Sequence, residues 1–149
     1  MKIGELARRS GCKVETLRFY EREGLLPEPA RSEGNYRLYS QAHAERLDFI
    51  RHCRALDMTL DEIRALLACH DDPSQPCDQA DSLIVEHLGH VAERIAQLER
   101  LKTELESLRE RCGGHRTAAE CGILSELSQP LAGASSNTGA HVPGTHSLR

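Results

Sequence analysis

Residues Asp78 to Arg111 read DQADSLIVEHLGHVAERIAQLERLKTELESLRER, an unbroken stretch of 34 residues. Its apolar positions are spaced by 4, 3, 4, 3, 3, 4 and 3 residues, which is typical of a coiled-coil seam with one local slip between Leu98 and Leu101. The stretch therefore predicts one long helix that packs against a second helix. The seam positions are Ile84, Leu88, Val91, Ile95, Leu98, Leu101, Leu105 and Leu108.

Cysteines flank this predicted helix. Cys77 precedes it, Cys112 follows it, and Cys121 comes shortly afterwards. A helix that rises about 1.5 Å per residue holds its two end thiols roughly 50 Å apart, so one chain cannot bring both to one ion. Two such helices packed antiparallel would place Cys77 of one protomer beside Cys112 and Cys121 of the other. We therefore predict a metal site that two protomers of a homodimer share.

The composition limits the class of protein. A chain of 149 residues forms one globular domain, or a small domain with an appended helix and tail. The sequence shows neither a signal peptide nor a long apolar run, so we expect a cytoplasmic protein. Thiols stay reduced in the cytoplasm, and the six cysteines therefore favour metal or redox chemistry over disulfides. No pattern of nucleophile, base and orienting group is visible, so we do not expect an enzyme.

Charge is distributed unevenly along the chain. Residues 1–58 carry 11 Lys and Arg against 9 Asp and Glu, a balance of +2, whereas residues 59–149 carry 8 against 14, a balance of −6. The first half suits a polyanion better than the second. Because +2 is modest, binding to nucleic acid must depend on where individual arginines lie.

The first third of the chain predicts two short helices and a ribbon. Apolar residues with helical spacing on either side of Ser10-Gly11 favour a helix-turn-helix, with its second helix ending at Gly24. The alternation in Tyr36 to Tyr39, beside the turn Glu33-Gly34-Asn35, predicts a small β-ribbon wing. The residues expected in the core are Leu17, Phe19 and Leu38.

Capping signals place the remaining helices. Ser40 is a plausible N-cap, and Thr59 with Glu62 forms a capping box for a helix that ends within residues 70–73. Thr117 with Glu120 predicts a second capping box, opening a short helix through Leu127. The Gly- and Ser-rich segment after it predicts a flexible tail. The expected divisions are 1–70 for DNA binding with linking helices, 71–129 for dimerisation and metal binding, and 130–149 for the tail.

Two segments carry a family resemblance. TLRFYEREGLLPEPAR, Thr16 to Arg31, and GNYRLY, Gly34 to Tyr39, resemble the MerR family of bacterial transcription regulators, with IGELA before them and FIRHCRALDMTLDEIR after them in the family's order. The three cysteines make the chain most similar to the cadmium- and lead-responsive regulators of the CadR and PbrR type. The resemblance implies a mainly α fold. Its parts are a winged helix-turn-helix with a β-ribbon wing, a long antiparallel coiled-coil dimerisation helix, a metal-binding loop and a short C-terminal helix.

The resemblance also implies a function and its contacts. A homodimer would bind a palindromic operator and, with RNA polymerase at the promoter, activate a heavy-metal resistance promoter by distorting the DNA. For Tyr20 and Tyr39, half-buried packing is the alternative to DNA contact. Lys13 stands where relatives often carry a capping Ser or Asn, so we expect a small cost in stability. The implied DNA-binding residues are Thr16, Arg18, Tyr20, Arg31, Tyr36, Arg37 and Tyr39.

The ligand type narrows the metal. Thiolates suit soft ions and do not suit magnesium, calcium or manganese. Copper(I) sensors of the family lack a thiol at the position of Cys77, which favours a divalent ion. Zinc(II) needs a further ligand, and relatives supply a cysteine where this chain has Gly113, although His115 could substitute. Cadmium(II) or lead(II) is therefore the preferred effector, with mercury(II) and zinc(II) as alternatives.

Histidines suggest a second metal site. His87 and His90 lie one turn apart and share a helix face, and the partner's tail would bring His141 and His146 to the same end of the dimer. Glu62 could add a carboxylate, although its capping role already explains it. The alternative is that all four histidines are solvated surface residues. The remaining cysteines are expected to be small packing residues: Cys12, Cys53 and Cys69.

Three other functions compete with metal sensing. A thiol redox sensor would oxidise Cys77 and Cys112 to a disulfide between subunits and respond to peroxide without metal. A drug-responsive regulator would need an aromatic pocket in the second half, but no aromatic residue follows Phe49. A structural zinc site would leave the apo protein unable to dimerise.

Overall fold

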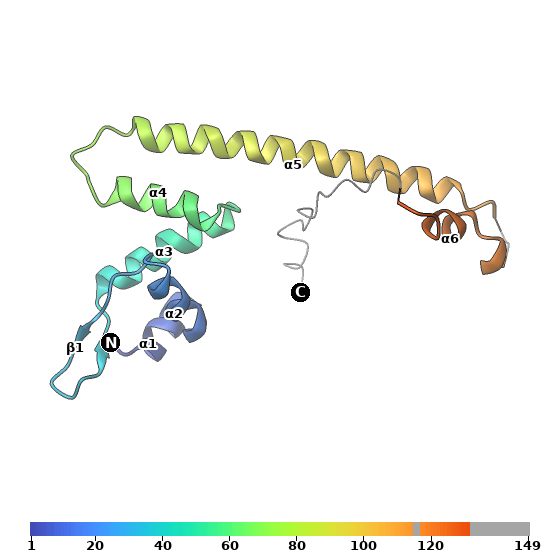
Figure 1. Cartoon of the computed structure of the whole chain (residues 1–149). Helices are drawn as coiled ribbons and strands as arrows, with labels where there is room; N and C mark the ends of the chain where they lie inside the picture. The colour runs from blue at the N-terminus through green and yellow to red at the C-terminus, as the bar shows by residue number, and fades with distance from the viewer. Residues whose placement is uncertain (115–116, 132–149) are drawn as a thin grey trace. The chain divides into compact units, whose positions relative to one another are not determined.

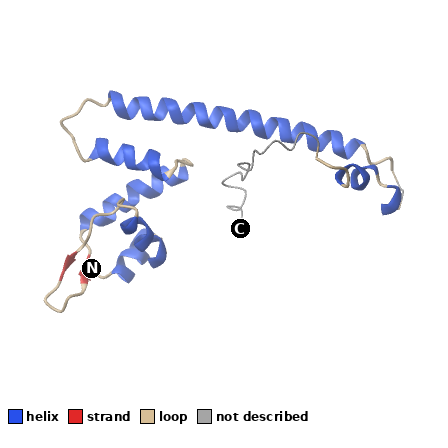
Figure 2. Cartoon of the chain, in the orientation of Figure 1, coloured by secondary structure: helices blue, strands red, loops and turns tan. Residues whose placement is uncertain are grey.

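The computed structural model describes residues 1–114 and 117–131. Its described part is mainly helical, with a two-stranded sheet as the wing, which confirms the predicted fold class (Figures 1 and 2). Two compact units, residues 1–85 and residues from 86 onward, divide the chain. The elements are α1 (Ile3–Ser10), α2 (Val14–Arg22), β1 (Ala30–Arg31), β2 (Arg37–Leu38), α3 (Gln41–Ala55), α4 (Leu60–His70), α5 (Asp78–Glu110), a 3-10 turn (Ala118–Glu120) and α6 (Gly122–Leu127).

The helix-turn-helix consists of α1 and α2. Gly11 ends α1 with φ 64°, in the left-handed region where a glycine is unstrained, and it turns the chain directly into α2. Lys13 is the N-cap of α2 and makes no side-chain hydrogen bond there, as its residue type predicted. Gly24, with φ 74°, lies just beyond the end of α2, where the sequence placed the break.

Leucines and isoleucines fill most of the core of the first unit. The prediction of core residues is wrong for two of the three. Leu17 is fully buried, but Phe19 is 37% exposed and Leu38 is 40% exposed. Phe19 stands two positions after Leu17, so helical geometry turns it to another face of α2. Leu38 belongs to a strand of two residues, both of them exposed, so β2 contributes neither of its side chains to the core. The fully buried large side chains are Leu6, Leu17, Leu25, Leu47, Ile50 and Ile63.

Both predicted caps of the linking helices are present. Ser40 is the N-cap of α3, and its backbone N–H donates to Nδ1 of His43 at 3.1 Å. In α4 the Glu62 N–H donates to Thr59 Oγ1 at 3.2 Å, and the Thr59 N–H donates to Glu62 Oε1 at 3.0 Å. This capping box satisfies two backbone donors that the start of a helix leaves without partners. The helix ends at His70, within the predicted turn.

Arg46 on α3 ties the loop after α2 to the end of α4. Its Nε donates to the carbonyl oxygen of Leu25 at 2.6 Å. Its Nη1 and Nη2 donate to Asp71 Oδ1 and Oδ2 at 2.6 and 3.1 Å, the bidentate geometry in which arginine binds carboxylates most strongly. Hydrogen bonding to Arg46 holds the pKa of Asp71 below its usual value.

We expect Asp71→Asn to lower the free energy of unfolding by roughly 0.5–1 kcal/mol at neutral pH, because the carboxylate is half exposed and water screens the pair. The folded pKa lies below the unfolded one. The stabilisation is therefore fully present above the unfolded value and is lost as the pH falls through the folded pKa. Urea unfolding of parent and variant at several pH values measures both effects. Asp48→Asn, which removes an exposed carboxylate from α3, is the control, and equal stabilities at neutral pH would contradict the prediction.

The second unit contains most of α5, the 3-10 turn and α6. The predicted capping box at Thr117 is wrong: Thr117 makes no side-chain capping hydrogen bond, and α6 begins only at Gly122. Cys121 is extended, with φ −69° and ψ 119°, so it separates the 3-10 turn from α6 and serves as the N-cap of α6. Among the described residues, no helix combines the length and apolar character that crossing a bilayer requires.

Candidate functional site

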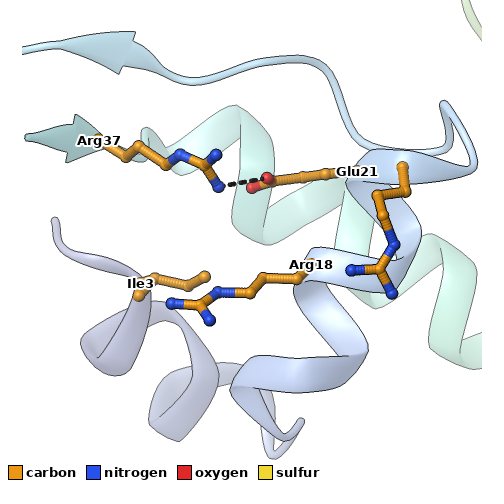
Figure 3. Close-up of a pocket in the computed structure, with 5 residues that line it drawn as sticks. Ile3, Arg18, Glu21 and Arg37 are labelled. Atoms are coloured by element: carbon orange, nitrogen blue, oxygen red, sulfur yellow. Dashed lines mark hydrogen bonds and ion pairs between the residues drawn. The ribbon is translucent and has the colours of Figure 1, made fainter.

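A basic hollow of about 370 Å³ lies beside α2 in the first unit (Figure 3). Arg18 and Glu21 project from α2 beside Ile3 of α1, and Arg37 reaches across from β2 (Figure 3). Arg22 of α2 completes the lining. Three guanidinium groups against one carboxylate make the hollow positive, which suits a phosphate oxygen of a nucleic acid backbone.

One carboxylate organises the wing side of this hollow. Arg37 Nη1 donates to Glu21 Oε2 at 3.0 Å, and the Tyr39 hydroxyl donates to Glu21 Oε1. Burial, with a contribution from the hydrogen bond to Glu21, raises the pKa of Tyr39 to about 12. The hydroxyl therefore stays protonated at neutral pH and remains a donor to the carboxylate.

The wing presents exposed cationic and aromatic side chains. Arg31 and Arg37 face each other in the register of the antiparallel pair β1 and β2. Asn35, with φ 64°, forms the tip, and Arg31 Nη1 donates to its carbonyl oxygen at 3.2 Å. Tyr36 is 65% exposed, and the Lys2 ammonium lies 5.4 Å from the centre of its ring. These side chains are accessible to a polyanion.

Two of the seven residues predicted to contact DNA lie in the core. Tyr20 is 7% exposed and Tyr39 is 3% exposed, so the structure favours the packing alternative for both. Their rings extend the aliphatic core, and the Tyr39 hydroxyl is already used by Glu21. Thr16 is half-buried on α2.

Glu21 and Arg22 line the hollow, yet sequence reasoning did not single them out. They stand three and four positions after Arg18, the spacing that places residues on one face of a helix. The spacing alone could have indicated both residues, because side chains on the same helix face as Arg18 lie close to any DNA that Arg18 contacts.

A pair of thiols lies at the other end of the chain. Cys112 follows α5 and is exposed, and Cys121 is half-buried at the start of α6. Backbone N–H groups of Leu124 and Ile123, together with a hydrogen bond to Cys112, lower the pKa of Cys121. The structure thus brings Cys112 and Cys121 together and favours the thiolate, the form that binds metals.

Cys77, the third predicted ligand, belongs to the first unit. It is exposed and immediately precedes α5. Burial raises the pKa of the Cys12 and Cys53 thiols, which fits packing rather than metal binding. Cys69 is half-buried on α4.

Gly122, next to Cys121, packs closely against the backbone of Arg111, next to Cys112. A Cβ atom at this position would collide with the carbonyl oxygen of Arg111 and would lie 3.1 Å from its carbonyl carbon. Since backbone cannot move aside cheaply, we expect Gly122→Ala to push α6 away from the end of α5 and weaken metal binding roughly tenfold, as loss of a supporting contact does at metal sites. Competition titration with a chromophoric chelator measures this affinity.

The control for this substitution is Gly89→Ala on α5, where an added Cβ meets nothing within 4 Å. It makes the same chemical change in open space. Equal metal affinities for Gly122→Ala and the parent protein would show that the close approach to Arg111 does not position Cys121.

The described part of the chain contains half of the histidines predicted for a second metal site. His87 and His90 lie on α5 with ring centres 6.4 Å apart. His141 and His146, like His115, lie outside the described residues. Glu62 caps α4 as expected. The second site stays a prediction.

Comparison with known proteins decides the family. Residues 1–69 match the profile described as MerR HTH family regulatory protein, and residues 44–108 match the profile described as MerR, DNA binding. The HTH-type transcriptional regulator ZntR homolog of Haemophilus influenzae is 44% identical over 111 residues, which cover 74% of this chain and 82% of the relative. The chain belongs to the MerR family.

Two solved structures are similar to the chain over most of its length. The transcription regulator PbrR691 from Ralstonia metallidurans, in complex with lead(II), is 53% identical with a TM-score of 0.78, over 86% of this chain and 99% of that one. MerR from Bacillus megaterium, in complex with mercury(II), is 33% identical with a TM-score of 0.68, over 87% of this chain and 100% of that one. Members of the MerR family are DNA-binding transcriptional regulators and not enzymes, as the sequence predicted.

Proposed function

We propose that this chain forms a homodimer that activates a heavy-metal resistance promoter when lead(II) or cadmium(II) binds three thiolates. Cys112 and Cys121 of one protomer and Cys77 of the other would supply them. The observation that carries this proposal is the close approach of Gly122, next to Cys121, to Arg111, next to Cys112, at the end of α5. Two thiols held together, one with a lowered pKa, form an incomplete site for a soft ion, and a third thiolate would complete it.

The exposed side of α5 supports a second copy as the partner. Seam residues such as Leu88, Ile95 and Leu105 are 61%, 53% and 65% exposed in the single chain. An apolar groove of about 410 Å³ between Leu98 and Arg109 follows the same side. A stripe of apolar residues along 33 helical residues matches the seam of a coiled coil, which a second α5 would bury.

Antiparallel packing follows from the positions of the thiols. Cys77 precedes a helix of 33 residues and Cys112 follows it, so a helix about 50 Å long separates them within one chain. In a parallel pair both copies of Cys77 would lie at one end, and both copies of Cys112 and Cys121 would lie at the other, so no site would contain all three thiols. In an antiparallel pair Cys77 meets the partner's Cys112 and Cys121 at both ends.

Lead(II) and cadmium(II) are the preferred ions on two grounds. The ligands we propose are three sulfurs, and a three-thiolate site suits both ions, whereas zinc(II) needs a further ligand. The 53% identical structure is that of a regulator in complex with lead(II). Zinc(II) and mercury(II) are the competing effectors, since one relative is a ZntR homolog and another structure is in complex with mercury(II).

The first unit would carry the DNA contacts. Four exposed side chains would bind phosphate oxygens: Arg18 and Arg37 in the basic hollow, and Arg31 and Tyr36 on the wing. Thr16 lies on α2, the helix expected in the major groove. Metal binding would reorganise the segment from Cys112 to Cys121 and, through the dimer, change how the two DNA-binding units bend and untwist the operator. The deformed promoter would then be the form that RNA polymerase uses.

A promoter-reporter titration with lead, cadmium, zinc, mercury and copper salts tests the effector. We expect lead or cadmium to activate at the lowest concentration. A lower threshold for zinc or mercury would replace the proposed ion while leaving the site intact. Activation by peroxide in the presence of a chelator would instead identify a thiol redox sensor and contradict the proposal.

Metal affinity should depend on pH because protons and metal compete for the thiolates. Cys121 has a lowered pKa, so its thiolate forms at a lower pH than that of an ordinary cysteine. As the pH falls below the pKa of each ligand, affinity should fall by up to about tenfold per pH unit for each thiol that must release its proton. Titrations with lead or cadmium between pH 8 and pH 5 measure this slope, and a flat profile would exclude thiolate ligation.

A further inference from the structure

The Glu21 carboxylate is a negative charge inside a surface that otherwise suits phosphate. It shares the hollow with Arg18, Arg22 and Arg37, and its side chain is 11% exposed, whereas that of Arg37 is 44% exposed. Like charges repel, so a carboxylate at this place weakens the attraction of the hollow for phosphate. A second role in DNA binding would have to compensate for this repulsion. The contacts of Glu21 indicate this role.

Glu21 binds two residues of the wing at once. Arg37 and Tyr39 are two positions apart, so they point to the same side of the extended chain, and both donate to the same carboxylate, Arg37 Nη1 to Oε2 and the Tyr39 hydroxyl to Oε1. Tyr39 is itself fixed, since it is 3% exposed and its backbone N–H donates to the carbonyl oxygen of Met1 at 2.7 Å. The wing is therefore attached to α2 through one side chain.

We infer that Glu21 is a positioning residue for DNA binding, which holds the Arg37 guanidinium beside Arg18 so that both reach the same stretch of phosphate backbone. This inference rests on the DNA contact proposed above for Arg37. A guanidinium has five N–H donors, and the contact of Nη1 with Glu21 leaves other donors to face a phosphate. A long side chain on a two-residue strand would otherwise lose conformational entropy when it binds, and the contact with Glu21 reduces that loss.

The positioning role and simple repulsion predict opposite signs. If Glu21 only repels phosphate, Glu21→Gln tightens operator binding. If it positions Arg37, the same substitution weakens operator binding, because glutamine offers a neutral oxygen in place of a charged partner and no longer holds the guanidinium. We expect a loss of roughly fivefold, somewhat less than the loss for Arg37→Ala, since a mobile Arg37 still contributes its charge.

The salt dependence of binding separates positioning from a general structural effect. Each phosphate contact contributes about 0.9 to the slope of log affinity against log salt concentration. We expect Arg37→Ala to reduce this slope by about one contact and Glu21→Gln to reduce it by less, while thermal unfolding of both variants stays close to that of the parent. The control is Glu33→Gln in the wing turn, which removes an exposed carboxylate without touching Arg37 and should leave the slope unchanged.

The experiment is a fluorescence anisotropy titration of the full-length protein with its operator duplex over a range of salt. It uses the parent, Glu21→Gln, Arg37→Ala and the double variant, and Glu21→Gln is expected to add little in the Arg37→Ala background. Glu21→Asp, which keeps the charge but shortens the reach, should also lower the slope and serves if Glu21→Gln fails to fold.

Three results would overturn the inference. One is unchanged or tighter binding by Glu21→Gln, and another is a loss that adds in full to that of Arg37→Ala. In either case a weakened Arg37→Ala would leave the proposed DNA contact intact. The third is an Arg37→Ala variant that binds like the parent, which would remove the DNA contact and the positioning role together.

Discussion

Cys112→Ser should abolish activation by lead or cadmium while leaving the protein bound to its operator. The Cys112 thiol is exposed and contributes to the lowered pKa of Cys121, so its loss removes one proposed ligand and weakens the thiolate character of another. Substitution of residues that merely support a metal ligand costs about 10–100-fold in affinity, so loss of the ligand itself should raise the half-maximal metal concentration by about 100-fold or more. Reporter titration and operator binding of the metal-free protein measure the two effects separately.

Substitution of either of the other two proposed ligands should have the same effect as Cys112→Ser, whereas substitution of a cysteine outside the proposed site should not. Cys77→Ser and Cys121→Ser are expected to lose the response with operator binding retained. Cys69→Ser is the matched control, because it removes a half-buried thiol from α4 that is not part of the proposed site. A full response from Cys77→Ser would show that the site is made by one protomer and would contradict the shared site.

The parts of the fold that were predictable depend on signals within a few residues of the chain. The turn at Gly11, the capping box of Thr59 with Glu62 and the apolar period of α5 each reflect local geometry, and the structure contains all three. Lys13 shows the same principle in reverse: it stands where relatives often carry a capping Ser or Asn, and its side chain makes no capping hydrogen bond at the start of α2.

The errors arise where a local signal depends on tertiary packing. Thr117 with Glu120 has the spacing of a capping box, but the chain makes only a 3-10 turn there because extended Cys121 interrupts the helix. Leu38 has an apolar side chain and sits in a predicted strand, but that strand has no second layer to cover it. A tyrosine has a polar hydroxyl that suits the surface and a large ring that suits the core. Residue type therefore does not predict the burial of Tyr20 and Tyr39, which depends on the residues that surround them.

The candidate site shows the same limit. The sequence predicted three cysteine ligands by type and spacing, and the structure adds the approach of Cys121 to the end of α5 near Cys112. The sequence alone could not identify Glu21, because the role inferred for that residue depends on its contact with Arg37 of the wing, sixteen positions away. Pairing across such a separation is a property of the folded unit.

A double substitution in the seam of α5, Leu98→Glu with Leu101→Glu, should convert the dimer into monomers. Both side chains are 45% exposed in the single chain and line the apolar groove that a second α5 would cover. Each leucine is worth about 1.5–3 kcal/mol when buried, and twofold symmetry doubles the number of leucines lost. Each protomer would then place two carboxylates against the apolar seam of its partner, so the dissociation constant of the dimer should rise by about 10⁴-fold or more.

Loss of the dimer should also remove operator binding and metal sensing together, which distinguishes this variant from the cysteine variants. A monomer binds one half-site and loses the gain from linking two, so operator affinity should fall by about 100-fold or more. Thr103→Glu is the control, because its side chain lies with Glu99 and Glu104 on another face of α5. Sedimentation equilibrium and anisotropy titration with the operator duplex measure both quantities. A dimeric, metal-responsive double variant would show that the seam of α5 is not the dimer interface, and the site shared through it would then have no partner to supply Cys77.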